Sequence, residues 1–115
     1  MEKKNKTVLK PWGKEIIIEK RSDHWIKKLV VRQDAELSLQ SHQDRTEIWI
    51  VLSGKIKVIK GSKQQTLKEG DFIKIDKKEK HRIIGLQDSV VLETALGRVR
   101  QNDITRFKDD YGRVD

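Results

Sequence analysis

Short apolar segments, separated by glycines and polar turns, recur along most of this chain and limit the folds that it can adopt. The segments are rich in β-branched and large apolar residues, and they cover Glu15–Glu19, Trp25–Val31, Leu37–Gln40, Glu47–Leu52, Lys55–Lys60, Gln65–Leu67, Phe72–Ile75, His81–Leu86 and Val90–Leu96. Strands of this length that recur about every ten residues are typical of an all-β sandwich or barrel. No segment before residue 100 keeps an apolar period of about 3.6 residues, so we expect few helices.

The chain has 115 residues, and no linker, repeat or low-complexity segment divides it, so we expect one domain over residues 1–115. Two features near its ends have alternative interpretations. Pro11-Trp12-Gly13 forms either a lid over one end of the fold or a turn whose Trp12 packs against the outside of a sheet, and we favour the second. The tail from Asn102 to Arg113 forms a short helix or an ordered loop, with Asp103 as a candidate helix N-cap.

Two charged residues fall on strand faces that are otherwise apolar. Alternate residues of a strand face opposite sides, so Lys27 shares its face with Leu29 and Val31. By the same rule, Glu47 shares its face with the apolar residues at 49 and 51. Because a buried charge without a partner is costly, we expect both residues to be paired, metal-bound or functional.

A set of four polar side chains has the character of a metal site. Gln40 and His42 are two residues apart, so they point the same way on a strand, and Glu47 follows after a short turn. His81 begins a late strand, and neighbouring antiparallel strands would bring the four side chains together. Imidazole, carboxylate and amide oxygen suit one divalent ion: Zn²⁺ first, with Mn²⁺, Fe²⁺, Co²⁺ or Ni²⁺ as alternatives. Otherwise the two histidines are ordinary polar residues near strand ends. His24 lies in the turn Ser22-Asp23-His24, and we expect it to be a surface residue.

These residues resemble a known family. The spacing of Gln40, His42 and Glu47, followed by Gly70-Asp71 and His81, resembles the two cupin motifs, with glutamine in place of the usual first histidine. That variant resembles the type II mannose-6-phosphate isomerase family, whose domain also forms the C-terminal part of bifunctional mannose-1-phosphate guanylyltransferases. Further similar motifs are Lys10-Pro11-Trp12-Gly13, Leu37-Ser38-Leu39-Gln40, Arg45-x-Glu47-x-Trp49 and Asp109-x-Tyr111-Gly112-Arg113. The resemblance implies a cupin fold, which is a double-stranded β-helix or jelly-roll barrel, with a short C-terminal tail.

The resemblance also implies an activity. The family interconverts mannose 6-phosphate and fructose 6-phosphate through a cis-enediolate, and the metal stabilises the negative charge that develops on the sugar oxygens. Catalytic candidates are Lys27, Glu47 and Arg45, with Lys27 as base or charge stabiliser and as a sugar contact. Arg45, Arg82 and Arg106 are candidates for binding the phosphate, and otherwise they are surface or loop-pinning arginines. The sequence does not single out a base.

Two other functions remain open at this point. The chain could be a non-catalytic sugar-binding cupin that regulates or accompanies nucleotide-sugar synthesis. It could also be a related cupin enzyme, such as a sugar epimerase. It lacks a Gly-rich nucleotidyltransferase segment, so we expect no guanylyltransferase activity of its own.

The net charge of +8 bears on the partners. The lysines are spread along the chain without interleaved aromatics, so we expect no nucleic-acid binding, and the positive field would attract a small anionic sugar phosphate. No apolar run reaches the length of a membrane span, the N-terminus has no signal-peptide pattern and cysteine is absent, so we expect a cytoplasmic protein without membrane contact. Edge strands favour pairing between chains, so we expect a homodimer.

Overall fold

The computed structural model describes residues 5–112, and within them the chain forms strands, turns and loops but no helix. The strands are β1 (Lys6–Lys10), β2 (Gly13–Lys20), β3 (His24–Val31), β4 (Leu39–Ser41), β5 (Arg45–Ser53), β6 (Lys55–Lys60), β7 (Lys63–Lys68), β8 (Phe72–Ile75), β9 (His81–Gly85), β10 (Ser89–Gly97) and β11 (Thr105–Lys108). The all-β prediction is confirmed. Nothing in this part of the chain has the helical length and apolarity needed to cross a bilayer.

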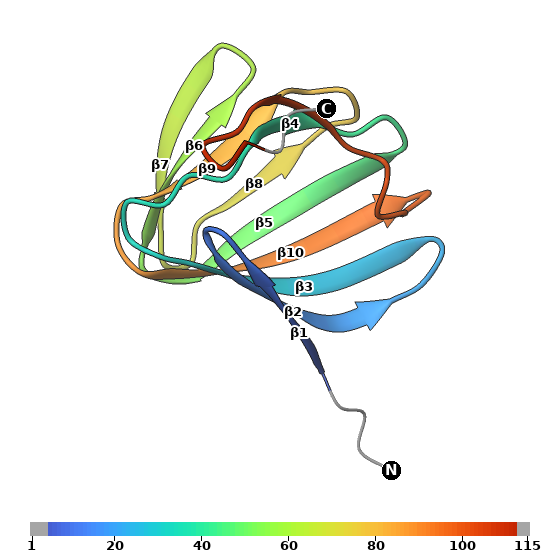
Figure 1. Ribbon diagram of the computed structural model, residues 1–115, viewed down its shortest axis with the longest axis horizontal. Coiled ribbons are helices and arrows are strands. Elements are labelled where there is room, and N and C mark those ends of the chain that lie inside the picture. The colour runs from blue at the N-terminus through green and yellow to red at the C-terminus, as the bar shows by residue number, and fades with distance from the viewer. Residues whose placement is uncertain (1–4, 113–115) are drawn as a thin grey trace.

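The strands form two antiparallel sheets that face each other (Figure 1). One sheet has the order β1-β2-β3-β10-β5-β8, and the other has the order β11-β4-β9-β6-β7. Inward and outward residues alternate along β3, β5 and β10, as the two-residue period of a strand requires. The inward residues of both sheets meet in a main core cluster that includes Leu29, Val51, Ile56, Ile83 and Val91.

The C-terminal tail forms an ordered loop interrupted by one strand, and not a short helix, while Arg113 at its end lies outside the described residues. β11 pairs antiparallel with β4, so that Thr105 lies opposite Ser41 and Arg106 opposite Gln40. Asp103 therefore caps no helix. β1 and β11 escaped prediction because both are short edge strands with mostly exposed side chains, which leaves no apolar alternation to detect.

Trp12 lies in the core, so its expected position outside the sheet is wrong. Its side chain is only 4% exposed and belongs to the main core cluster. The turn that directs it inward ends at Gly13, whose φ is 154°. A Cβ at Gly13 would lie 1.8 Å from the carbonyl oxygen of Val30, so this close approach of β2 and β3 requires glycine.

Candidate metal centre

The two predicted histidine ligands and the predicted glutamate ligand meet between the two sheets. Glu47 comes from β5 of the first sheet, whereas His42 directly follows β4 and His81 begins β9 in the second sheet. All three side chains are buried, and one ligand atom from each lies within 4.8 Å of the others. Gln40 of β4 lies opposite His81 of β9 in the paired strands, so the remaining predicted ligand, Gln40, lies beside His81.

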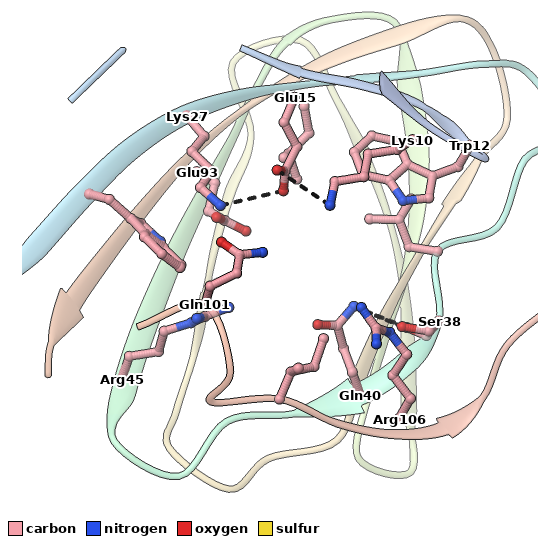
Figure 2. A pocket seen from close by; sticks show the side chains of 14 residues that line it. Lys10, Trp12, Glu15, Lys27, Ser38, Gln40, Arg45, Glu93, Gln101 and Arg106 are labelled. Atoms are coloured by element: carbon pink, nitrogen blue, oxygen red, sulfur yellow. Dashed lines mark hydrogen bonds and ion pairs between the residues drawn. The ribbon is translucent and has the colours of Figure 1, made fainter. Parts of the chain in front are cut away.

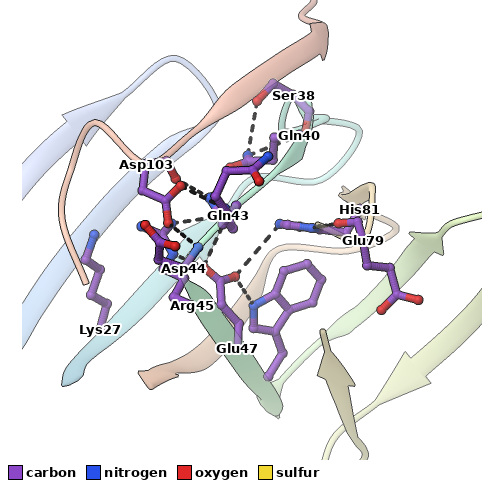
Figure 3. A network of polar contacts seen from close by, with 12 residues as sticks. Lys27, Ser38, Gln40, Gln43, Asp44, Arg45, Glu47, Glu79, His81 and Asp103 are labelled. Atoms are coloured by element: carbon purple, nitrogen blue, oxygen red, sulfur yellow. Dashed lines mark hydrogen bonds and ion pairs between the residues drawn. The ribbon is translucent and has the colours of Figure 1, made fainter. Parts of the chain in front are cut away.

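Backbone carbonyls fix which nitrogen of each imidazole can bind a metal. His42 Nδ1 donates to the carbonyl oxygen of Asp103 at 2.6 Å, and His81 Nδ1 donates to that of Glu79 at 2.8 Å. Each Nε2 therefore keeps its lone pair. The Nε2 atom of His42 lies 3.3 Å from Glu47 Oε2, and that of His81 lies 3.9 Å from Glu47 Oε1. Both Nε2 atoms thus lie close to one carboxylate, and Figure 3 shows the His81 ring facing the Glu47 carboxylate.

The protonation states suit a cation. Burial lowers the pKa of His42 to about 4 and also lowers the pKa of His81, so both rings are neutral at physiological pH. Burial by itself raises the pKa of Glu47, but His42, His81 and Arg45 outweigh that effect and hold it below its ordinary value. Two neutral imidazoles and one carboxylate are a donor set that fits a divalent transition-metal ion.

Gln40 has an orientation compatible with the predicted fourth ligand. Its amide nitrogen donates to Ser38 Oγ at 3.1 Å, which leaves the amide oxygen available to a ligand. The residue lines the same small cavity as Glu47 and His81. Its role as a ligand stays a prediction, supported by this orientation.

Arg45 places a positive charge against the same ligand atoms. Its Nε donates to Glu47 Oε2 at 2.8 Å, and its Nη2 lies 3.1 Å from His42 Nε2. The guanidinium carbon also lies 4.6 Å from the ring centroid of Trp25. Arg45 thus contacts two of the three candidate ligands, and an ion bound by both Nε2 atoms would take the place of its contact with His42.

A larger cavity adjoins this centre. Figure 2 shows its wall of polar and charged side chains, which includes Lys10, Glu15, Lys27, Ser38, Gln40, Arg45, Glu93, Gln101 and Arg106. Lys27 is 2% exposed, so its predicted inward direction is confirmed. Its Nζ lies 3.4 Å from Glu15 Oε1 and 3.8 Å from the centroid of Trp25, and Glu15 also pairs with Lys10 at 3.8 Å. The charge on Lys27 is therefore partnered.

The arginines predicted to bind phosphate lie in different places. Arg45 and Arg106 both line the larger cavity. Arg82 contributes to the wall of the small cavity, but its guanidinium holds the tail: it donates to the carbonyl oxygens of Leu37 at 2.7 Å and Lys108 at 3.3 Å. It also pairs with Glu36 and Asp110. A phosphate role remains a prediction for all three, and the geometry favours Arg45 and Arg106.

Sequence reasoning overlooked Glu93. This residue is 7% exposed on β10 and lines both the small and the larger cavity. Burial, followed by the nearby Glu47 charge, raises its pKa to about 8. The two-residue period could have found it, because Val91, Glu93 and Ala95 share a face just as Glu47 and Trp49 do.

Asp103 was also overlooked as part of the centre. Its carboxylate accepts from the backbone amides of Gln43 at 2.8 Å and Asp44 at 2.9 Å, and its carbonyl oxygen holds the imidazole of His42. Burial raises the pKa of this carboxyl, but the two backbone amides together with His42 and Arg45 outweigh burial and lower it. The contact joins residues about sixty positions apart, so no local pattern pointed to it.

Comparison with known proteins places the chain within a sequence family. A family model described as "Mannose-6-phosphate isomerase C-terminal" matches residues 1–109. The xanthan biosynthesis protein XanB of Xanthomonas campestris is 34% identical over 113 residues, which cover 96% of this chain and 24% of that protein. The mannose-1-phosphate guanylyltransferase of Escherichia coli K12 is 31% identical, again over 96% of this chain and 24% of its own. The chain therefore spans about a quarter of the length of these relatives.

Solved structures confirm the expected cupin fold. An RmlC-like cupin from Shewanella frigidimarina superposes with a TM-score of 0.78 and 15% identity, covering 85% of this chain and 87% of that one. An oxalate decarboxylase from Bacillus subtilis gives a TM-score of 0.80 and 15% identity, covering 90% of this chain and 30% of that one. At this identity the likeness is one of fold alone.

Proposed function

This chain belongs to the family of mannose-6-phosphate isomerase C-terminal domains, and from that membership we propose that it is a metal-dependent isomerase of a sugar phosphate. The reaction that we propose interconverts mannose 6-phosphate and fructose 6-phosphate, in the cytoplasm and with one divalent ion, zinc being the first to test. The names of the guanylyltransferase relatives support a substrate drawn from mannose phosphate metabolism.

The observation that carries the proposal is the buried group of His42, Glu47 and His81 beside a cavity of polar and charged side chains. Both imidazoles are neutral and direct Nε2 toward the Glu47 carboxylate. A binding module needs hydrogen-bonding side chains but no such ligand group. The combination therefore supports chemistry at an oxygen-bearing carbon of a sugar.

A divalent ion held by these ligands would supply positive charge that polarises a carbonyl and stabilises developing negative charge on oxygen. The chain's own residues have separate tasks. Lys27, fixed by Glu15 and Trp25, presents a buried ammonium to a sugar hydroxyl or its developing charge. Gln40 and Gln101 line the cavity as neutral hydrogen-bonding groups that orient the sugar.

The phosphate is proposed to bind at the Arg106 side of the cavity, with Lys10 as a second cation. Arg106 lies opposite Gln40 in the β11–β4 pair, so a phosphate bound there would fix one end of the sugar relative to a candidate metal ligand. A guanidinium suits this task because it can donate two parallel hydrogen bonds to phosphate oxygens.

The proposal is tested by incubating zinc-loaded protein with mannose 6-phosphate in deuterated water. An aldose–ketose isomerase places deuterium at C2 of the recovered mannose 6-phosphate and forms fructose 6-phosphate, both of which NMR detects. Chelation of the metal should stop both processes, and His81→Ala should behave like the chelated protein. An intact C2–H signal after prolonged incubation with zinc and with manganese would refute the isomerase.

A second candidate is a non-catalytic sugar-binding cupin that regulates or accompanies nucleotide-sugar synthesis. The cavity of polar and charged side chains supports it, because such a wall can hold a sugar phosphate without any reaction. That function predicts sugar phosphate binding by calorimetry without any deuterium at C2. An epimerase instead predicts a product inverted at another carbon, which the same NMR spectra would reveal.

A further inference from the structure

We propose that Glu93 is the catalytic residue that carries the proton between C2 and C1 of the sugar, an assignment that rests on the proposed isomerase function. Glu93 lies near the middle of β10, directly opposite Lys27 of β3 and Trp49 of β5. Its backbone therefore lies in the middle of a sheet, paired on both sides, and not in a loop. A rigid position suits a group that must meet a carbon-bound hydrogen at short range.

The first argument is that the Glu93 carboxyl has no hydrogen-bond or ion-pair partner among the described residues. Within residues 5–112, Glu93 forms neither a hydrogen bond nor an ion pair, although it is almost fully buried. The other acids at the site are engaged: Glu15 pairs with Lys10 and Lys27, and Glu47 accepts from Arg45 and Trp49. A buried acid without a partner is costly for the fold, which points to a functional reason for keeping it.

The second argument is position. Glu93 lines the small cavity together with Gln40, Glu47 and His81, and it also lines the larger cavity with Lys10, Lys27 and Arg106. It thus lies at the junction between the metal ligands and the proposed sugar site. Figure 2 shows its carboxyl pointing into the open space that Gln40 and Gln101 also face. C1 and C2 of a bound sugar must occupy this junction if their oxygens approach the metal ligands.

The chemistry balances within the substrate. The ionised form of Glu93, whose share grows as pH rises toward its raised pKa of about 8, takes the C2 hydrogen as a proton. The C2–H electron pair forms the C1=C2 bond, and the carbonyl π pair moves onto O1. The protonated carboxyl then gives its proton to C1, and the C1=C2 electron pair forms the new C1–H bond. The O2–H bond breaks, its electron pair forms the C2=O2 bond, and its proton passes to O1. C1 is reduced and C2 is oxidised, so no external oxidant or reductant is needed.

The experiment compares wild type with Glu93→Gln, using mannose 6-phosphate that carries deuterium at C2 in ordinary water. A single shielded carboxyl should transfer part of the deuterium from C2 to C1 in wild type, as fructose 6-phosphate labelled at C1. The E93Q variant should lose both this transfer and the release of deuterium to solvent by about 10²–10⁴-fold, the usual contribution of general acid–base catalysis. Zinc stoichiometry and the dissociation constant of mannose 6-phosphate in chelator should match those of wild type.

A second variant separates chemistry from structure. Glu93→Ala leaves space beside Lys27, and added formate should restore part of the lost deuterium release, whereas formate should not affect Glu69→Gln, an exposed control. Equal rates in wild type and E93Q would overturn the role of Glu93 alone. Loss of zinc from E93Q, or no response of E93A to formate, would also overturn it. A wild type that leaves the deuterium at C2 would remove the isomerase function and this role together.

Discussion

At the scale of single residues, the protein buries several ionisable side chains inside its fold. Lys27, Arg45, Glu47 and Glu93 are all less than a tenth exposed. Three of them have partners that compensate for burial, either an ion pair or the face of Trp25. Glu93 is the fourth, and it has no such partner among the described residues. Because burial without a partner costs stability, its effect should be detectable in unfolding experiments.

Glu93 predicts a specific dependence of stability on pH. Its pKa rises from an ordinary 4.5 to about 8 on folding, so the folded state binds its proton more tightly than the unfolded state. This contribution is complete below about pH 4.5 and is lost as pH rises toward about 8. The measurement is urea unfolding of the metal-free proteins between about pH 5 and about pH 9, a range that includes the raised pKa. The free energy of unfolding of E93Q should increase relative to that of wild type as the pH rises.

The comparison with E93Q isolates this residue, because Glu15, Lys27, Arg45 and Glu47 face the cavity in both proteins. A difference between the two free energies of unfolding that stays constant over this range would contradict the raised pKa of Glu93.

Asp103 should control metal affinity through His42. In Asp103→Ala the backbone amides of Gln43 and Asp44 lose their acceptor. The loop around residue 103 is then held less firmly, and so is the backbone carbonyl of residue 103 that orients the His42 imidazole. Loss of such an orienting contact weakens metal binding by about 10–100-fold. Competition titration with a zinc-binding dye measures the effect, and Asp76→Ala, at an exposed residue, is the control. Unchanged zinc affinity in D103A would show that the loop does not orient His42.

At the scale of elements, the tail completes the candidate site. β11 pairs with β4 and forms one edge of its sheet (Figure 1). The segment before β11 contributes Asp103 to the centre and Gln101 to the cavity wall. Because the tail supplies both an orienting contact and part of the cavity wall, local unfolding of the tail should weaken ligand binding.

Arg82 is expected to hold this tail. Its guanidinium donates to the carbonyl oxygens of Leu37 and Lys108 and pairs with Glu36 and Asp110, so Arg82→Ala removes several charge-assisted contacts. We expect a loss of about 1–3 kcal/mol in unfolding free energy, with faster hydrogen exchange of the β11 amides. Arg98→Ala, at an exposed position, should change neither quantity. If R82A instead weakened only sugar phosphate binding, Arg82 would be a phosphate ligand and not a tail anchor.

At the scale of the whole molecule, the candidate centre connects the two sheets. Glu47 belongs to one sheet, and His42 and His81 belong to the other, so a bound ion would crosslink them. Zinc at a free concentration of 100 times its dissociation constant should stabilise the fold by about 2.7 kcal/mol. Calorimetry should show a higher melting temperature with zinc, reversed by chelator. A His81→Ala protein that gained the same shift from zinc would place the stabilising ion elsewhere.

The edges of the sheets bear on assembly. Leu9 on β1 is 82% exposed and Phe72 on β8 is 71% exposed, and both strands are edges of the same sheet. Exposed apolar side chains on unpaired edges favour association, so we predict a homodimer. Light scattering coupled to size exclusion measures the mass, and Leu9→Glu or Phe72→Glu should produce monomers if that edge pairs. A monomeric wild type at high concentration would refute the dimer.

The sequence by itself determined the features that follow from local pattern. Apolar alternation predicted the all-β class and most of the strands, and the parity of Lys27 and Glu47 showed that both point inward. Spacing and motif resemblance brought His42, Glu47 and His81 together correctly, because a strand period of two leaves little freedom in where a side chain points.

Only the tertiary structure decided how these groups are partnered. The pairing of β11 with β4, the contact of Asp103 with His42 and the engagement of Arg82 all join segments far apart in the sequence. The uncommitted state of Glu93 likewise depends on which neighbours pair with one another and leave it out. Period and composition encode the direction of a side chain, whereas its partners, its burial and hence its pKa are set by the packing of distant strands.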